Sequence, residues 1–435
     1  MQLKKIKPGK IKKEISVAAC ALLQAPATVY ATDAEWDVDT AVLYYGEGDG
    51  RVTAFEPAIY AGRDLGDGER IDLRIVFDVL TGATPNGAHA SSVAQTFTTP
   101  SGSGTYTAQA GETPLDDSFK DTRGALGADW TLPLDRLSRV KLGINASKEY
   151  DYTSLGLNAT YLKDLNNRNT TFSAALGFTN DIVAPVGGVP IGLSPMRQPG
   201  DTNREGSDDT KTITDVMLGL TQVISRTTLM QLNFSMGMVD GYQTDPYKIV
   251  TVVDPLTGLP DNTALLNLNA DALPYVYEQR PDSRQTNSLF FRTVHHLTSD
   301  IINFSYRYYW DDWGVSSNTF DLRYRYQIGK AYLQPHVRYY LQDAADFYRH
   351  NLVQSTDVDA GGNVLLSEVS SDYRLADLTT TTLGLKYGYA LGKNSELSIR
   401  GEMMNQSVDD GNVPSGEETP DLDAIILHAG YSFRW

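Results

Sequence analysis

The chain has almost no cysteine, no long hydrophobic run and no excess of basic residues. Its single cysteine among 435 residues is Cys20, which excludes a disulfide scaffold and any metal site built from several thiolates. No apolar run reaches the roughly 18 residues that a membrane-spanning helix requires. Acidic residues outnumber basic ones by 54 to 37, which argues against a nucleic-acid-binding protein.

Recognisable catalytic motifs are also missing. The sequence contains no zincin helix motif, nucleophile elbow, phosphate-binding loop or dinucleotide fingerprint. Its six histidines are scattered, and the adjacent pair His295 and His296 would point to opposite faces of a strand. We therefore predict a protein that is not an enzyme.

The first 31 residues have the composition of an export signal. Six lysines fall within the first 13 residues, a short apolar stretch follows over 15–23, and residues 25–31 are mostly small and end in Ala31. A basic start, a short apolar centre and a small-residue cleavage site are typical of a secretory signal peptide. We predict cleavage after Ala31, which removes Cys20 and leaves a mature domain over 32–435.

From residue 32 onward, segments of about ten residues alternate apolar with polar side chains, the period of a β-strand with two different faces. The clearest runs over 320–328, where Phe320, Leu322 and Tyr324 alternate with charged residues. The pattern predicts sixteen strands, at 35–46, 51–61, 69–81, 122–133, 139–149, 154–163, 169–180, 212–224, 227–239, 286–297, 300–311, 318–328, 331–342, 376–390, 395–407 and 422–435.

Loop lengths indicate how these strands are arranged. All the long connections (82–121, 181–211, 240–285, 343–375 and 408–421) follow odd-numbered strands, whereas short turns follow the even-numbered ones. Short turns at one end and long loops at the other are typical of outer-membrane barrels, and a soluble sandwich has no reason to obey this rule. We predict an all-β transmembrane antiparallel up-and-down barrel of about 16 strands, with short periplasmic turns and long extracellular loops.

The outer surface and the last strand predict two partners. Apolar side chains on one face of every strand would contact outer-membrane lipid, because a spanning barrel exposes that face to the bilayer. The alternating residues 427–435 end on an aromatic and resemble the signal that barrels present to the assembly machinery. Aromatic girdles at the two interfaces are predicted from seven residues near strand ends: Trp36, Tyr44, Tyr60, Trp130, Tyr161, Tyr387 and Tyr389.

Two groups of residues are candidates for function. The first is a set of lumen arginines: Arg292, Arg307, Arg323, Arg325 and Arg338. Such a wall could guide anions through a pore, or it could form a stiffening ladder with Asp311, Asp321, Glu396 and Glu402, which we favour.

The second group lies at the extracellular rim, where acidic and aromatic residues cluster at strand ends. The candidate ligands are four carboxylates: Asp245, Asp311, Asp312 and Asp346. Oxygen-rich side chains suit a hard cation, so calcium is the predicted cofactor. Mixtures of aromatic residues with Asp also suit sugars, and both residue types are common in turns and at membrane interfaces.

Several rim segments, taken in order, resemble an uncharacterised family of proteobacterial outer-membrane proteins (domain of unknown function 3570). The matching segments are 78–88, 149–154, 167–171, 244–248, 281–284, 310–314, 344–348 and 420–424. The resemblance implies an outer-membrane barrel without an assigned biochemical role. Family members occur beside genes for a flavin transferase and a thioredoxin-like protein, which implies a periplasmic redox partner.

Three functions follow from these observations. The first is a pore that transports small polar solutes. The second is a barrel that acts as a scaffold or conduit for an exported redox partner. The third is a rim-site hydrolase, which would need an Asp–His pair such as Asp346 with His350 beside a nucleophile.

Overall fold

A computed structural model describes residues 36–82, 85–91, 93–98, 105–115, 120–196, 203–409, 419 and 421–434. The predicted signal peptide, its cleavage site at Ala31 and the final Trp435 lie outside the described residues. None of the described helices is long and apolar enough to cross a membrane.

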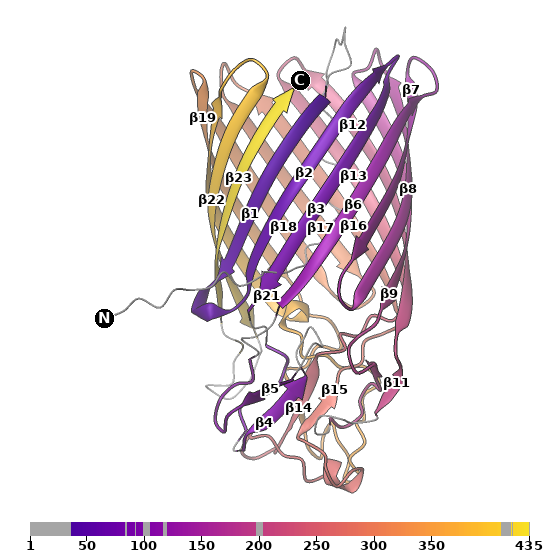
Figure 1. The fold of residues 1–435 in the computed structure, drawn as a ribbon, viewed down its shortest axis with the longest axis vertical. Coiled ribbons are helices and arrows are strands. Elements are labelled where there is room, and N and C mark those ends of the chain that lie inside the picture. Colours follow the sequence, from indigo (N-terminus) through magenta and orange to yellow (C-terminus); the bar gives the residue numbers. More distant parts are fainter. Residues whose placement is uncertain are drawn as a thin grey trace, which may run out of the picture.

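Sixteen antiparallel strands close into one barrel, in which each strand pairs with the next along the chain and β1 pairs with β23 (Figure 1). Their bounds are β1 Trp36–Glu47, β2 Thr53–Gly66, β3 Glu69–Thr81, β6 Lys120–Pro133, β7 Ser138–Lys148, β8 Tyr152–Leu165, β9 Thr170–Val183, β12 Asp209–Ser225, β13 Thr228–Gly241, β16 Ser283–His296, β17 Ile301–Asp311, β18 Ser316–Ile328, β19 Ala331–Gln342, β21 Asp377–Ala390, β22 Ser395–Asp409 and β23 Leu422–Arg434.

The prediction of an all-β barrel with sixteen strands is confirmed. Strands β3 and β19 have the predicted bounds, and the others differ from the prediction by one to five residues at one or both ends. The seam is a regular antiparallel ladder, in which Val42 pairs with Ala429 and Asp37 pairs with Arg434. Closure matters because a backbone N–H or C=O group at an open sheet edge would have no partner in lipid.

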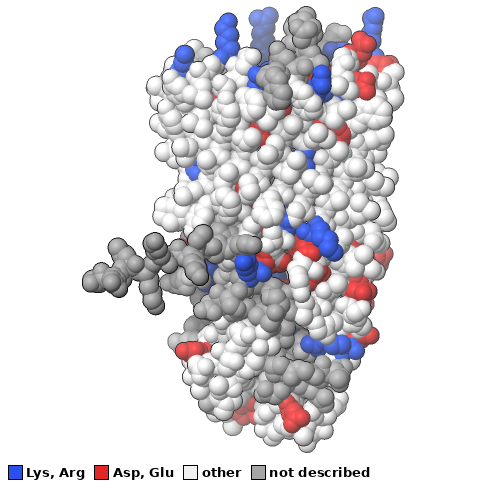
Figure 2. Space-filling model, in the orientation of Figure 1, with Lys and Arg blue, Asp and Glu red and all other residues white. Residues whose placement is uncertain are grey.

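The outer surface of the barrel is apolar across its middle. Figure 2 shows few charged residues on the wall, and Lys and Arg gather at the upper rim. Large apolar side chains of the barrel wall are exposed, among them Leu126 at 61% and Met403 at 70%. An exposed apolar belt of this extent is a lipid-facing surface, because a protein in water would bury it.

Six of the seven predicted girdle residues fit the outer surface, and Tyr60 does not. Tyr60 pairs with Asp39 and Arg74, on the inward face of β2, and its hydroxyl donates to Asp72 at 2.5 Å. Its assignment to a girdle is therefore wrong. The strand alternation already placed Tyr60 opposite the lipid-facing Ile59, which is 46% exposed.

The two ends of the barrel differ in the way the sequence predicts. At the end near the C-terminus, the connections are turns of at most four residues: 67–68, 134–137, 166–169, 226–227, 297–300, 329–330 and 391–394. At the other end lie all the long loops, which in an outer-membrane barrel are extracellular.

The long loops pack against one another and form a cap, which lies below the barrel in Figure 1. Its largest sheet has the order β15-β14-β20, with β14 and β15 antiparallel and β14 and β20 parallel. The cap elements are β4 Gln95–Thr98, β5 Thr105–Ala108, β10 Val189–Pro190, β11 Arg204–Gly206, β14 Ile249–Val253, β15 Tyr275–Tyr277 and β20 Asn351–Val353, with the 3-10 helices η3 Leu265–Asn267 and η4 Tyr373–Leu375; a third, η2 Gly48–Gly50, follows β1.

The cap has its own hydrophobic core. All five residues of β14 are buried, and Val250 and Val252 pack in one cluster with Leu265 and Leu352. A second cluster surrounds Tyr275, and a third, around Trp313, Phe347 and Leu375, lies where the cap meets β17 and β18. Because the core joins residues from several loops, the cap is one folded layer over the extracellular mouth.

Two glycines let the chain leave the wall and enter the cap. Gly82 follows β3 with φ +114°, and Gly241 ends β13 with φ +107°. A Cβ at Gly82 would lie 2.1 Å from the Arg51 carbonyl oxygen, and one at Gly241 would lie 2.3 Å from that of Thr210. Only glycine tolerates both this backbone conformation and such close backbone contacts.

The lipid-facing surface yields a test on β13. Leu232 faces outward near the middle of the strand, and Ser235 faces the lumen. Leu232→Arg should lower the free energy of unfolding by about 2–4 kcal/mol, because a charge at the bilayer midplane is costly. Ser235→Arg, the matched control, should change it by less than about 1 kcal/mol. Guanidinium titration in lipid vesicles measures both, and equal losses would contradict a lipid-facing Leu232.

Candidate functional site

The register of β16 to β19 places all five predicted arginines on the lumen face. Arg292 pairs with Ser305, Arg307 with Thr319, and Arg338 with Asp321. Arg323 and Arg325 continue the same face of β18. The outward neighbours, such as Phe320 and Leu322, are over 40% exposed, which fixes the opposite face as the lumen side.

The arginines form only part of the predicted carboxylate ladder. Asp321 is the centre of this ladder. Its carboxylate oxygens lie 2.9 Å from Arg338 Nη2, 3.1 Å from Arg323 Nε and 2.8 Å from His336 Nε2. Glu402 contacts His336 Nδ1 at 2.7 Å, so the histidine bridges two acids. These contacts stiffen the wall between β18 and β22.

Two of the other lumen arginines, Arg292 and Arg325, lie beside neutral partners. Arg292 Nε donates to the Asn303 side chain at 3.1 Å, and the Arg325 guanidinium lies 3.6 Å from the centre of the Tyr332 ring. Glu396 accepts from the Tyr332 hydroxyl and forms no ion pair with the described residues. This wall therefore keeps an excess of positive charge.

The wall formed by β1 to β12 carries the opposite excess. Asp72 and Asp129 share Lys141, and Asp72 also binds Arg70 at 2.7 Å. Three further inward acids make no ion pair with the described residues, namely Asp39, Glu56 and Asp215. The lumen thus has an acidic and a basic side, and such an arrangement orients charged or dipolar solutes.

A cavity of about 440 Å³ lies where the basic wall meets the cap. Four guanidinium groups line it, from Arg280, Arg284, Arg307 and Arg374. Within the described part of the chain, Asp372 is the one carboxylate in its lining, and the remaining polar surface comes mainly from β17, β18 and β19. Strand β16 begins and strand β17 ends at the level of this cavity. The barrel wall therefore forms one side of the cavity, and η4 of the cap forms the other.

Buried acids hold these arginines in place. Arg284 donates Nε and Nη2 to Asp311 Oδ2, at 2.9 Å and 2.5 Å, and its guanidinium lies 4.2 Å from the centre of the Trp313 ring. Asp311 also accepts from the backbone N–H groups of Trp313 and Val315. With its side chain fully buried, Asp311 both shapes the tight 312–315 turn and orients Arg284.

Asp372, which is 1% exposed, is the centre of a second network. It accepts from Arg280 Nη2 at 2.9 Å and Arg374 Nη2 at 2.6 Å, and Lys248 Nζ lies 3.8 Å away. Burial alone raises the pKa of Asp372, but Arg374, Lys248 and Arg280 together hold that pKa well below its ordinary value of 3.8. Asp372 is therefore ionised throughout the physiological pH range.

The four predicted calcium ligands have separate neighbours. Asp311 contacts Arg284, and Asp245 contacts Arg374 at 3.3 Å. Asp312 accepts from the Gln285 backbone at 2.8 Å, and the Asp346 carboxylate lies against Gly314. The structure does not bring these four side chains together into one set of ligands, and calcium binding at the rim stays a prediction.

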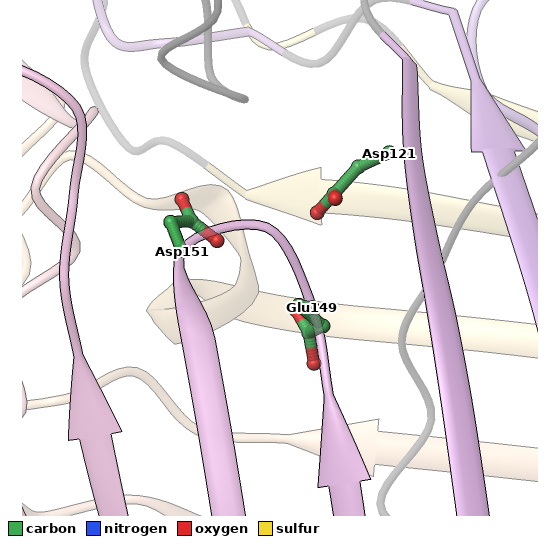
Figure 3. Close-up of side chains that lie close together, drawn as sticks. All are labelled: Asp121, Glu149 and Asp151. Atoms are coloured by element: carbon green, nitrogen blue, oxygen red, sulfur yellow. The ribbon is translucent and has the colours of Figure 1, made fainter.

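Three other carboxylates do converge at the rim (Figure 3). Asp121 at the start of β6 faces Glu149 and Asp151 from the β7–β8 turn, and their ligand atoms lie within 4.8 Å of one another. Asp151 accepts a hydrogen bond from the Tyr247 hydroxyl at 2.8 Å. Burial, and to a lesser extent the negative charge of Asp151, raises the pKa of Tyr247, so the hydroxyl stays protonated. This contact fastens the 242–282 loop to the β7–β8 turn.

The pair required for a hydrolase is arranged differently from the prediction. The His350 ring lies against the His89 ring, with centroids 4.8 Å apart, whereas the Asp346 carboxylate lies over Gly314. The described residues contain no cysteine. Neither they nor the comparisons below support a redox partner.

Sequence reasoning missed most of the cavity. Arg280, Arg374 and Asp372 come from two loops that the alternation of strands does not relate. A signal for Arg284 did exist, because pairing β16 with β17 sets Thr286 opposite Asp311 and so brings Arg284 near that acid.

The chain matches one family model, described as "Protein of unknown function (DUF3570)", over residues 12–433. No curated protein matches it. Similar solved structures include Pseudomonas aeruginosa OccK5 (9% identity, 93% of this chain and 98% of that one, TM-score 0.41), P. aeruginosa OccK2 in complex with glucuronate (11%, 92% and 98%, 0.40) and Acinetobacter baumannii OccAB1 (10%, 95% and 99%, 0.40).

The Asp372 network yields a prediction for the cap. Asp372→Asn leaves three cations without their shared acid, which should destabilise the cap by about 3–5 kcal/mol and speed its cleavage by protease. Asp271→Asn, at an exposed cap position, is the control and should leave the cleavage rate unchanged. If both variants resist protease like the wild type, Asp372 does not hold the cap.

The same network has a defined pH dependence. A carboxyl whose folded pKa is depressed stabilises the fold above its unfolded pKa, and that contribution is lost as pH falls through the folded value. Protease resistance of the cap should therefore be constant between about pH 5 and 8 and fall only below pH 3.8, the ordinary pKa of Asp372. A loss centred near pH 6 would contradict this assignment.

Proposed function

The chain belongs to the DUF3570 family of unknown function, and we propose that this member is an outer-membrane channel for small polar solutes. The observation that carries the proposal is the lining of the barrel: inward side chains are mainly charged or polar, and outward ones are mainly apolar. Barrels of sixteen or more strands are wide enough to leave an aqueous passage. A lumen of this chemistry favours water and hydrophilic solutes over lipid.

The cap and the lumen charges would set what enters. The cap covers the extracellular mouth, so a solute from outside passes its loops before it meets the barrel. Within the barrel, the acidic side around Asp215 and the basic side around Arg292 would align a dipolar solute across the passage. The channel would therefore select by charge distribution as well as by size.

Electrical recording from planar lipid bilayers tests the proposal. The protein purified from outer membranes should give stepwise conductance increases with a linear current–voltage relation. Asp215→Arg should raise the chloride-to-potassium permeability ratio at least twofold, because fixed charge in a narrow lumen selects ions by sign. The control Asp271→Asn, in the cap, should leave the ratio unchanged.

Two results would contradict a channel. One is a bilayer that stays sealed after insertion of folded protein, with folding verified by its resistance to SDS before heating. The other is a conductance that ignores Asp215→Arg, because a leak along the protein–lipid boundary would not sense a lumen charge.

A further inference from the structure

The cavity beneath the cap is lined by an unusual set of side chains. Four guanidinium groups surround about 440 Å³, and Asp372, the one carboxylate among the described lining residues, is already shared by Arg280 and Arg374. Asp311, which holds Arg284, is buried behind it. Glu278, which pairs with Arg280, and Asp245, which pairs with Arg374, also lie outside the lining, so the described residues that line the cavity carry four positive charges and one negative charge.

The ion pairs leave hydrogen-bond donors available. Arg284 uses Nε and Nη2 on Asp311, and Arg374 uses Nε and Nη2 on Asp372 and Asp245. Their Nη1 groups make no hydrogen bond with the described residues. Because one edge of each guanidinium is fixed by an acid, the other edge is held ready for a ligand, and little entropy is lost on binding.

Neutral oxygen and nitrogen atoms complete the lining. Ser317, Thr319, Tyr340 and Gln342 project from β18 and β19 into the same cavity. Hydroxyl and amide groups of this kind orient the uncharged part of a small ligand, while charged groups fix its acidic end. A volume of 440 Å³ lies within the range of small-molecule sites, which is roughly 300–1,000 Å³.

We propose that this cavity binds a small organic solute that carries a carboxylate or phosphate group, the acidic group being held by Arg284, Arg307 and Arg374. The proposal rests on the channel function above and names the class of solute that the channel takes. Guanidinium groups match the two oxygens of a carboxylate or phosphate in geometry as well as in charge. Cations of the same size are repelled by the same four groups.

Titration calorimetry on the detergent-solubilised protein tests binding without any requirement for conductance. Succinate and inorganic phosphate should bind with saturation, whereas butane-1,4-diol and butane-1,4-diamine, which match succinate in length but not in charge, should give no heat. Arg307→Gln should weaken succinate binding at least tenfold, and Arg307→Lys should weaken it less.

Arg325→Gln is the matched control, because Arg325 lies on the same wall, stacks on Tyr332 and does not line the cavity. It removes the same charge from the lumen and should change the affinity less than threefold. Equal weakening by Arg307→Gln and Arg325→Gln would show a diffuse field and overturn the site. Absence of succinate and phosphate binding to folded wild-type protein would overturn it as well.

Bilayer recording separates this proposal from the channel function. Succinate should reduce the wild-type current in a saturable manner, and Arg307→Gln should shift the half-blocking concentration at least tenfold. Conductance without block overturns the site and leaves the channel standing. Calorimetric binding without any conductance overturns the channel and leaves an anion receptor, whose site the Arg307 and Arg325 variants still define.

Discussion

The structure depends on the requirement that every backbone polar group inside a bilayer has a partner. The β1–β23 ladder meets this requirement, because it pairs the first strand with the last and leaves no free edge. Once the ring is closed, side-chain alternation decides the rest: Leu232 and its outward neighbours meet lipid, and polar residues line the interior. Sixteen strands then enclose a lumen too wide for side chains to fill by packing alone.

The barrel was predictable because its information is local. Apolar and polar side chains alternate along each strand, and each hairpin pairs neighbouring segments. A few residues on either side of Phe320 and Asp321 are therefore enough to assign one to the outer face and the other to the lumen. Tyr60 was misassigned because residue type was given more weight than alternation. The positions of the lumen arginines followed from the same rule, whereas their partners did not, because Arg325 and Arg292 lie beside Tyr332 and Asn303 instead of acids.

The cap and the cavity were not predictable, because they depend on contacts between distant loops. Strand β14 pairs in parallel with β20, and Asp372 gathers cations from two other loop segments. No periodicity links such segments. The sequence made Asp311 a candidate both as an arginine partner and as a calcium ligand, and in the structure it pairs with Arg284. The buried run of β14 was the one local sign that these loops possess a core.

The most direct test of the account is a spin-label scan along β13, for which the mature chain offers a background free of native cysteine once residues 1–31 are removed. Single cysteines from Gln231 to Met236 in lipid vesicles would be labelled, and their access to oxygen and to a water-soluble nickel reagent compared. The account predicts oxygen access at Leu232, Phe234 and Met236, and nickel access at the other three positions: Gln231, Asn233 and Ser235. Uniform access to the nickel reagent along the strand would contradict a lipid-facing closed barrel.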